Sequence, residues 1–232
     1  MAVILAARNI SKEFAAGRTG AVRALSGVSA DVEEGRVVCF RGRSGSGKTT
    51  LVNILGALDM PTEGSVMFGG EDITALSEAK RDRLRRYEMA FVFQSVALIG
   101  SMTAFENVEL ALRLAGVPAG ERARRVSECL ARVGLEKRSG HRPAELSGGE
   151  QQRVAIARAI CHNPKVIFAD EPTAELDTVT GLAVMRLFRD LVKEGEFGRA
   201  IVMTTHDEAM MESADVTYTL EDGEITSVDV QR

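Results

Sequence analysis

The chain has 232 residues, of which 45% are hydrophobic and 27% charged, and its net charge is −4. This balance is typical of a globular protein, and the length allows one large domain or one core with an inserted subdomain. The acidic balance gives no reason to expect a nucleic-acid partner. Three scattered cysteines predict buried thiols rather than disulfides or a zinc site. No apolar stretch reaches the ~18 residues that span a bilayer.

Apolar runs alternate between strand-like and helical patterns along the chain. The first run lies in residues 1–14, lacks a basic leader and a cleavage site, and predicts a strand rather than a signal peptide. Later runs that are continuously apolar are typical of strands covered on both faces, and spacing near 3.6 predicts helices. The pair Asp222-Gly223 predicts a hairpin turn between two late strands. Predicted strands cover 36–40, 89–93, 165–169, 199–205 and 216–220, and predicted helices cover 48–58, 105–115, 119–133, 149–161 and 178–194.

A phosphate-binding loop follows the first of these later strands. Residues 42–49, GRSGSGKT, match G-x-x-x-x-G-K-[ST] between a predicted strand and a predicted helix, which is the context that the motif requires. The glycines let backbone N–H groups surround phosphate, and the helix start adds partial positive charge. Lys48 is expected to reach the β- and γ-phosphates, and Thr49 to bind Mg²⁺. The candidate nucleotide-binding residues are Gly42, Arg43, Ser44, Gly45, Ser46, Gly47, Lys48, Thr49 and Thr50.

Polar side chains follow three other predicted strands. Ligands of α/β proteins bind beyond the carboxyl ends of parallel strands, so these side chains are candidates for catalysis beside Lys48. Asp170 is placed to hold Mg²⁺ through water, and Glu171, which follows it, is placed to polarise the attacking water. Gln94 can bind Mg²⁺ or orient water, and His206 can hydrogen-bond the γ-phosphate. Taken alone, each is also explained as an ordinary surface residue.

The segment 146–153, LSGGEQQR, starts the helix predicted at 149–161. Ser147 with Glu150 three residues later predicts a capping box, and the helix start offers a second anion site. A well-capped helix is the simpler explanation. One chain needs only one cradle for one triphosphate, however, so the second makes sense if it serves the nucleotide of another copy, with Ser147, Gly148 and Gly149 acting in trans.

The order of these motifs resembles that of the ATP-binding cassette (ABC) ATPases over nearly the whole chain. The resemblance implies an α/β P-loop NTPase fold with a mixed β-sheet, ATP hydrolysis with Mg²⁺, and an ATP-dependent head-to-tail homodimer. It implies that Asp177, in the segment TAELD, lies where subunits meet, and that Phe14 stacks on adenine, although Phe14 as a core residue is the alternative. It divides the single domain 1–232 into a RecA-like core with an N-terminal β-subdomain (1–94 and 161–232) and a helical signature subdomain (95–160).

Three stretches, 22–35, 58–73 and 102–116, are similar to the lipoprotein-release and macrolide-efflux type of cassette. That similarity implies export, or release of a lipoprotein, peptide or drug, through separate membrane permeases of few spans. It places the chain in the cytoplasm, on the inner face of the cell membrane. Residues 95–101 fit this type loosely, and the stretch near them faces the membrane partner, so the transported molecule stays undefined.

The basic segment 80–88, KRDRLRRYE, predicts a solvated helix face, or else a contact with an acidic partner or anionic lipid. Three other functions are alternatives to transport. A soluble ABC ATPase with a non-transport partner would carry a long coiled coil or a second cassette. An ATP-binding regulator of a membrane complex would not need Glu171, and a P-loop kinase would leave LSGGEQQR unexplained.

Overall fold

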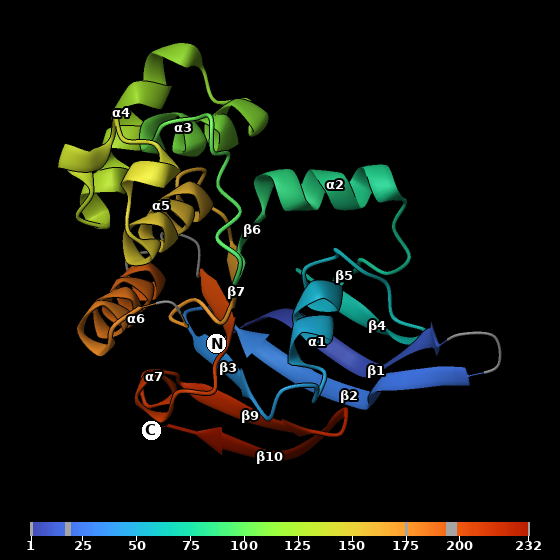
Figure 1. Cartoon of the computed structure of the whole chain (residues 1–232). Helices are drawn as coiled ribbons and strands as arrows, with labels where there is room; N and C mark the ends of the chain where they lie inside the picture. Colours follow the sequence, from blue (N-terminus) through green and yellow to red (C-terminus); the bar gives the residue numbers. More distant parts are fainter. Residues whose placement is uncertain (1, 17–19, 175, 194–198, 232) are drawn as a thin grey trace.

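The computed structural model describes residues 2–16, 20–174, 176–193 and 199–231 of the chain. It contains two sheets and a cluster of helices at one end (Figure 1). The mixed α/β character confirms the predicted fold class. The strands are β1 Val3–Ala16, β2 Gly20–Glu33, β3 Val37–Arg41, β4 Glu63–Phe68, β5 Glu71–Asp72, β6 Met89–Val92, β7 Val166–Asp170, β8 Ala200–Thr204, β9 Val216–Glu221 and β10 Glu224–Val230.

The six-stranded sheet has the order β10-β9-β3-β8-β7-β6. All neighbouring strands are parallel except β9 and β10, which form the predicted hairpin around Asp222 and Gly223. Both turn residues have positive φ, 47° and 83°, as a tight two-residue hairpin requires. The five strands predicted from apolar runs are all present, and their carboxyl ends share one edge of the sheet, so side chains that follow them are brought together.

Helices cover both faces of this sheet because its strands are apolar on both sides. Val38 and Phe40 of β3 belong to one hydrophobic cluster, together with residues of α1 (Lys48–Leu55). Val37 and Cys39 belong to the other, together with residues of α5 (Gly148–Ile160) and α6 (Thr178–Lys193). Alternation along one strand therefore separates α1 from α5 and α6, and Figure 1 shows these helices on opposite sides of the strands.

The four-stranded sheet has the order β2-β1-β4-β5 and is antiparallel. Its strands β1 and β2 are 14 residues each and pair with several register shifts, one of them between Ala7 and Ile10. The N-terminal strand was predicted, whereas β2, β4 and β5 were not. The buried side chains of β1, β2 and β4 join the α1 cluster, so this sheet supports α1 and the loop that precedes it.

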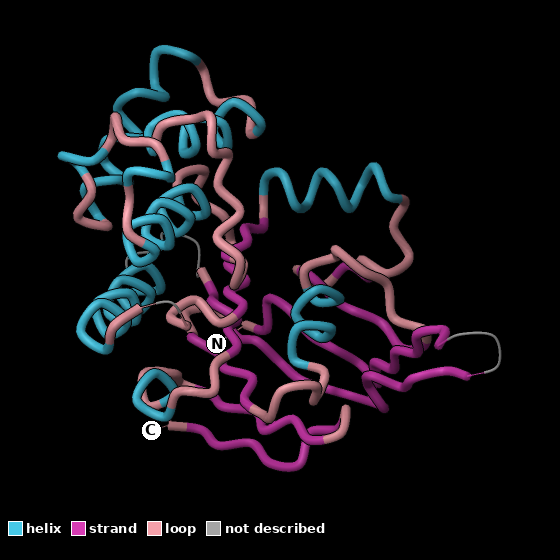
Figure 2. The backbone as a smooth tube through the Cα atoms, viewed as in Figure 1, coloured by secondary structure: helices cyan, strands magenta, loops and turns pink. Residues whose placement is uncertain are grey.

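Residues 95–160, all of them described, form helices and no strand (Figure 2). Those helices pack into the cluster that covers the α5 face of the core sheet, so one apolar core joins them to it. The basic segment forms α2, whose residues, all within the described chain, keep at least partial exposure. The remaining helices are α2 Glu78–Tyr87, α3 Ala104–Leu114, α4 Ala119–Arg132, α7 Glu208–Met211 and two 3₁₀ turns, Glu136–Arg138 and Pro143–Glu145.

The three cysteines are buried and unpaired, as expected. Desolvation raises the pKa of Cys39 and Cys161 to about 12 and that of Cys129 to about 11, so all three thiols are neutral at physiological pH. Across the described residues, none of the helices combines the length and the apolar character needed to cross a bilayer.

Candidate nucleotide-binding and catalytic site

A pocket of about 700 Å³ lies at the carboxyl edge of the core sheet, around the start of α1. Nearly all of the residues predicted to touch ATP line it, although they come from four distant parts of the chain. Ala24 of β2 also lines the pocket and was not predicted, because nothing in its local sequence marks it. The lining residues are Ala24, Gly42, Arg43, Ser44, Gly45, Gly47, Lys48, Thr49, Thr50, Gln94, Glu171 and His206.

At two positions of the loop only glycine fits, because the backbone of a neighbouring strand lies where a side chain would begin. A Cβ at Gly42 would lie 2.1 Å from the carbonyl oxygen of Leu220, and a Cβ at Gly47 would lie 2.5 Å from that of Ala24. Gly47 is also the residue before α1 and has φ 101°, in the left-handed region. The loop is therefore pressed between β2 and β9, and this packing holds its backbone around the pocket.

Lys48 is nearly buried, at 7% exposure, although it is charged. Its Nζ donates to the carbonyl oxygens of Gly42 (2.8 Å) and Arg43 (3.0 Å). These two bonds hold the ammonium group inside the curve of the loop. A positive charge fixed there by neutral carbonyls keeps its attraction for phosphate oxygens that enter the pocket.

The two acidic residues at the carboxyl end of β7, Asp170 in the strand and Glu171 directly after it, contact threonines from neighbouring elements. Asp170 accepts hydrogen bonds from the hydroxyls of Thr49 (2.9 Å) and Thr204 (2.6 Å), one at each carboxylate oxygen. The backbone N–H of Glu171 donates to the same Thr204 hydroxyl at 2.9 Å. Thr204 was not predicted, because a threonine in an apolar strand is read as an ordinary strand residue. The only available signal was its place two residues before His206.

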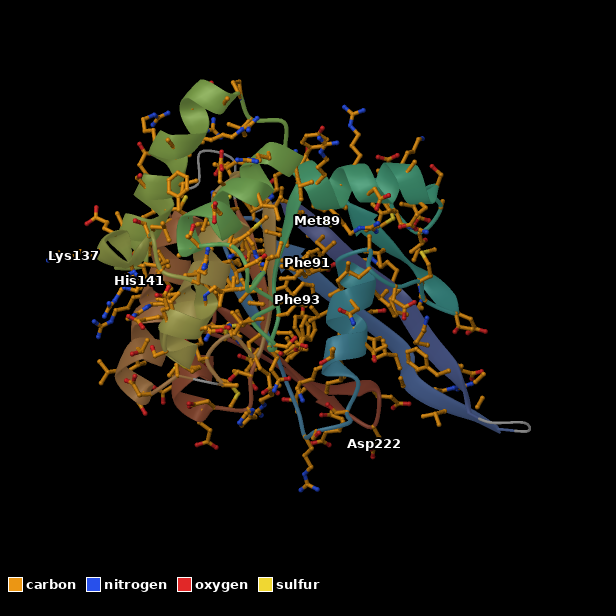
Figure 3. All side chains as sticks on the ribbon, turned by 45° about the horizontal axis from the view of Figure 1, so that its top comes forward. Met89, Phe91, Phe93, Lys137, His141 and Asp222 are labelled. Atoms are coloured by element: carbon orange, nitrogen blue, oxygen red, sulfur yellow. The ribbon has the colours of Figure 1, made fainter. Side chains whose placement is uncertain are left out.

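Glu171 and His206 lie side by side in the pocket. The His206 Nδ1 is 3.3 Å from Glu171 Oε2, and Glu171 has φ 45°, a value uncommon for a residue with a side chain. Gln94, which follows β6, lines the same pocket. Figure 3 shows Met89, Phe91 and Phe93 following one another along that strand, beside α1. Stacking of Phe91 on Phe93 at 5.7 Å fixes the course of the chain just before Gln94.

The oxygen ligands present fit Mg²⁺. Thr49 and Asp170 supply a hydroxyl and a carboxylate that already lie 2.9 Å apart, and Gln94 adds a neutral amide oxygen nearby. Mg²⁺ prefers such ligands and uses only one or two protein carboxylates, completing its shell with water and substrate phosphates. Within the part of the chain that is described, no group of three or more His, Cys, Asp or Glu side chains could hold a metal by itself.

Phe14 lies on β1 and does not line this pocket in the described chain. Its side chain is 43% exposed, which argues against the alternative of a core residue. The Nζ of Lys12 lies 5.0 Å from the ring centroid, held by Asp59 at 2.7 Å and the Met60 carbonyl at 2.6 Å. Ser46, predicted with the loop, turns a buried hydroxyl inward and is likewise absent from the described lining.

The segment LSGGEQQR begins α5, on the sheet face opposite α1. Ser147 and Glu150 form the predicted capping box: the Ser147 Oγ accepts from the Glu150 N–H at 3.2 Å, and the Glu150 carboxylate accepts from the Ser147 N–H at 2.9 Å. That backbone bond is the main cause of the lowered pKa of Glu150. Ser147, Gly148, Gly149 and Asp177 are not among the described lining residues of the pocket.

Gly148 differs from the loop glycines in what surrounds it. Measured against the described atoms, a Cβ there would meet nothing within 4 Å, whereas a Cβ at Gly149 would lie 3.2 Å from Leu176. The buried Gln152 ties α5 to the segment after β7 by donating to the Pro172 carbonyl at 3.0 Å. The fold of one chain thus explains Gly149 better than Gly148.

A phosphate loop after a parallel strand, with carboxylates at the end of a nearby strand, defines this protein as a P-loop nucleoside triphosphatase.

Comparison with known proteins narrows this class. The sequence model of the family described as "ABC transporter" matches residues 25–174. The chain therefore belongs to the ABC transporter family, as its ATP-binding and ATP-hydrolysing component. It is 48% identical to an uncharacterized ABC transporter ATP-binding protein of Thermotoga maritima over 90% of this chain and 88% of that protein. It is 44% identical to the macrolide export ATP-binding/permease protein MacB of Bradyrhizobium diazoefficiens, over 97% of this chain.

The chain spans only 34% of the length of that MacB protein. Its fold is similar to the dimeric structure of a post-hydrolysis state of the ATP-binding cassette MJ0796 bound to ADP and Pi, with a TM-score of 0.92 and 39% sequence identity. That match covers 98% of this chain and 99% of the other. This similarity shows that the fold described above is that of an ATP-binding cassette.

Proposed function

We propose that this chain is the ATPase subunit of a transporter of the export or release type. Two copies close head-to-tail around two ATP molecules, and hydrolysis opens them again. The observation that carries this proposal is the separation of the two phosphate-binding helix starts. The starts of α1 and α5 belong to opposite faces of one sheet, so the start of α5 is available to a nucleotide held by a second copy.

Within one chain, the loop and its neighbours bind the nucleotide. The backbone N–H groups of residues 42–50 and the ammonium of Lys48 hold the phosphates, and Phe14 stacks on adenine. Thr49, Gln94 and Asp170 hold Mg²⁺, with Asp170 acting through water; when bound, the ion neutralises charge on the phosphates. The 2.9 Å contact between Thr49 and Asp170 supports this assignment because it brings two oxygen ligands to one point.

Hydrolysis needs an oriented water molecule and little covalent chemistry from the protein. Glu171 polarises that water, Gln94 helps to orient it, and His206 donates a hydrogen bond to the γ-phosphate. The 3.3 Å contact between His206 and Glu171 supports these roles, since both side chains then face the same small volume of the pocket.

The second copy supplies Ser147, Gly148 and Gly149 to the γ-phosphate, and Asp177 lines the contact between subunits. Ser147 uses an oxygen lone pair for its capping bond, so its hydroxyl proton is still a donor. The open space around Gly148 supports close approach of a phosphate. Asp177 accepts from Thr180 at 3.0 Å through the backbone N–H, which holds the carboxylate at the start of α6.

Residues 95–160 act in this proposal as a helical subdomain that carries the α5 start, and residues 1–94 and 161–232 act as the core. Exposed apolar side chains near residues 95–101 support a docking face for separate permeases of few spans on the inner side of the membrane. They are Phe93 and Ile99, at 36% and 39% exposure. Relatives named as ATP-binding/permease proteins, such as MacB and PvdT, favour a permease as the partner.

The test separates binding, hydrolysis and action in trans. Glu171→Gln should bind ATP without cleaving it, so dimer should accumulate in Mg-ATP. Adding Ser147→Arg places bulk where the other copy's γ-phosphate must fit, and should return the protein to monomer while each chain still binds ATP. Light scattering after gel filtration measures the dimer, beside a separate nucleotide-binding assay. A double variant that dimerises as well as Glu171→Gln would refute the role in trans.

A further inference from the structure

Thr204 lies at the end of β8, directly beside Asp170 in the parallel pairing of β7 with β8. The residue is fully buried, at 0% exposure. Sheet register therefore delivers one hydroxyl to the point where β7 ends and the two site carboxylates begin. A buried hydroxyl costs free energy unless it is hydrogen-bonded, so its partners decide what it does there.

Both bonding functions of this hydroxyl are used on the site. It donates to Asp170 Oδ1 at 2.6 Å and accepts from the backbone N–H of Glu171 at 2.9 Å. The other Asp170 oxygen accepts from Thr49 at 2.9 Å. The Asp170 carboxylate is thus fixed at both oxygens, one toward the phosphate loop and one toward β8, and its plane cannot rotate without breaking a bond.

The bond to Glu171 acts on an unusual backbone. Glu171 has φ 45°, a conformation that disfavours a residue with a Cβ and persists only where surrounding structure holds it. Its N–H is held by the Thr204 hydroxyl, and its carboxylate faces His206 at 3.3 Å. Loss of the hydroxyl would free this peptide to relax, and the carboxylate would move with it.

We infer that Thr204 is a positioning residue for ATP hydrolysis, which couples the orientation of Asp170 to that of Glu171 through one hydroxyl. This inference rests on the proposed roles of those two carboxylates. Thr204 is fully buried and is not among the described residues that line the pocket; it sets the distance and angle between the group assigned to Mg²⁺ and the group assigned to the attacking water. Geometry of this kind acts on turnover more than on nucleotide affinity.

The matched pair Thr204→Ser and Thr204→Ala tests this role. Both variants lose the same methyl group, and only serine keeps the hydroxyl. We expect Thr204→Ala to lower kcat about ten- to hundredfold, because hydrogen bonds to a charged group are lost. Thr204→Ser should keep most of the wild-type kcat. The ATP dissociation constant should stay close to wild type in both. Thr204→Val, which keeps the shape without the hydroxyl, should resemble Thr204→Ala.

A second readout does not depend on turnover. Slow hydrolysis should make Thr204→Ala accumulate ATP-bound dimer by light scattering, as Glu171→Gln does, while Thr204→Ser should not. Thr217→Val, at a buried threonine of β9 outside the pocket, is the control and should match wild type. Equal kcat for the serine and alanine variants, beside an inactive Glu171→Gln, would overturn the positioning role and leave the proposed function standing. An active Glu171→Gln would overturn the site assignment beneath both.

Discussion

Two helices of this chain begin with a glycine-rich turn, and they treat their first N–H groups differently. The start of α1 follows Gly47 in the left-handed conformation, and none of the described side chains caps it. The start of α5 follows Ser147 in an extended conformation and carries a complete capping box. The first helix therefore offers its N–H groups to a ligand, whereas the second satisfies part of its own and has less to offer.

The glycines show the same difference. Gly42 and Gly47 are needed inside one chain, since a Cβ at either would overlap a carbonyl oxygen. Gly148 faces open space among the described atoms. This difference supports the proposal that the α1 start binds nucleotide unaided and that the α5 start adds to a nucleotide already bound by another copy. Variants at the two starts should consequently differ in what they change.

The largest effect is expected at the α1 start. Lys48→Ala removes a charge that two carbonyls hold inside the loop, so ATP affinity should fall by about 3 kcal/mol or more, and turnover should disappear. Calorimetric titration of ATP and a phosphate-release assay measure the two losses. Lys80→Ala, at an exposed lysine of α2, is the matched control and should leave both unchanged. Wild-type turnover by Lys48→Ala would mean that the assigned loop is wrong.

The starts of α1 and α5 could both be predicted from the sequence because the interactions that form them are local. A loop motif and a capping box are local, so both could be predicted from a few consecutive residues. The long apolar strands were equally plain. Strand β2 was missed because bulges interrupt its alternation, as at Gly27 with φ 62°, and only four of its positions are buried. Helix α1 was predicted three residues too long, because it ends at Leu55 and Ala57 then adopts φ 57°, in the left-handed region that stops a helix.

The parts of the site that could not be predicted depend on sheet register. Thr204 and Ala24 reach the pocket region because β8 pairs with β7 and β2 crosses the loop. Neither arrangement can be predicted from the residues around Thr204 or Ala24. Partner roles were inferred from a different kind of signal. Ser147 stood out because one chain had more phosphate-binding segments than one nucleotide needs.

The next largest effect is expected for adenine binding, and it tests whether ATP affinity comes from the pocket around the start of α1. Phe14→Ala should weaken ATP binding by about 1–3 kcal/mol, the range for loss of base stacking, and leave the melting temperature without nucleotide nearly unchanged because the ring is 43% exposed. Val22, paired with Phe14 across the β1–β2 ladder, provides the control Val22→Ala. A similar loss of affinity in both variants would assign the effect to the hairpin rather than to stacking.

A smaller effect is expected for Ser147→Ala at the α5 start. Loss of the cap should cost about 1 kcal/mol of unfolding free energy. Helix α3 carries the same capping box, formed by Thr103 and Glu106, so Thr103→Ala should cost about as much. Only Ser147→Ala should also weaken ATP-driven dimerisation, measured by light scattering in the Glu171→Gln background. Equal dimerisation by the two variants would show that Ser147 only caps α5, and that the α5 start has no role toward the nucleotide of another copy.

The smallest effect tests the charge at the α5 start. Glu150 holds a carboxylate 2.9 Å from the Ser147 N–H, at the place assigned to the other copy's γ-phosphate, and Arg138 offsets it from 3.2 Å. Glu150→Gln keeps a capping amide and removes the negative charge, so it should cost only about 0.3–1 kcal/mol of stability at neutral pH. Because the folded-state pKa lies below the ordinary 4.5, that contribution is present above pH 4.5 and is lost as pH falls through the folded value.

The same substitution should strengthen the ATP-driven dimer, because like charges no longer oppose each other when a phosphate approaches the helix start. We expect Glu150→Gln, in the Glu171→Gln background, to dimerise at lower ATP than its parent, with a gain that shrinks as salt screens the charge. Glu106→Gln in α3 is the matched control: the Thr103 N–H likewise lowers the pKa of Glu106, so stability should follow pH in the same sense while dimerisation stays constant. Weaker dimerisation of Glu150→Gln would show that the carboxylate supports the α5 start by holding its cap, and that the phosphate does not come close to it.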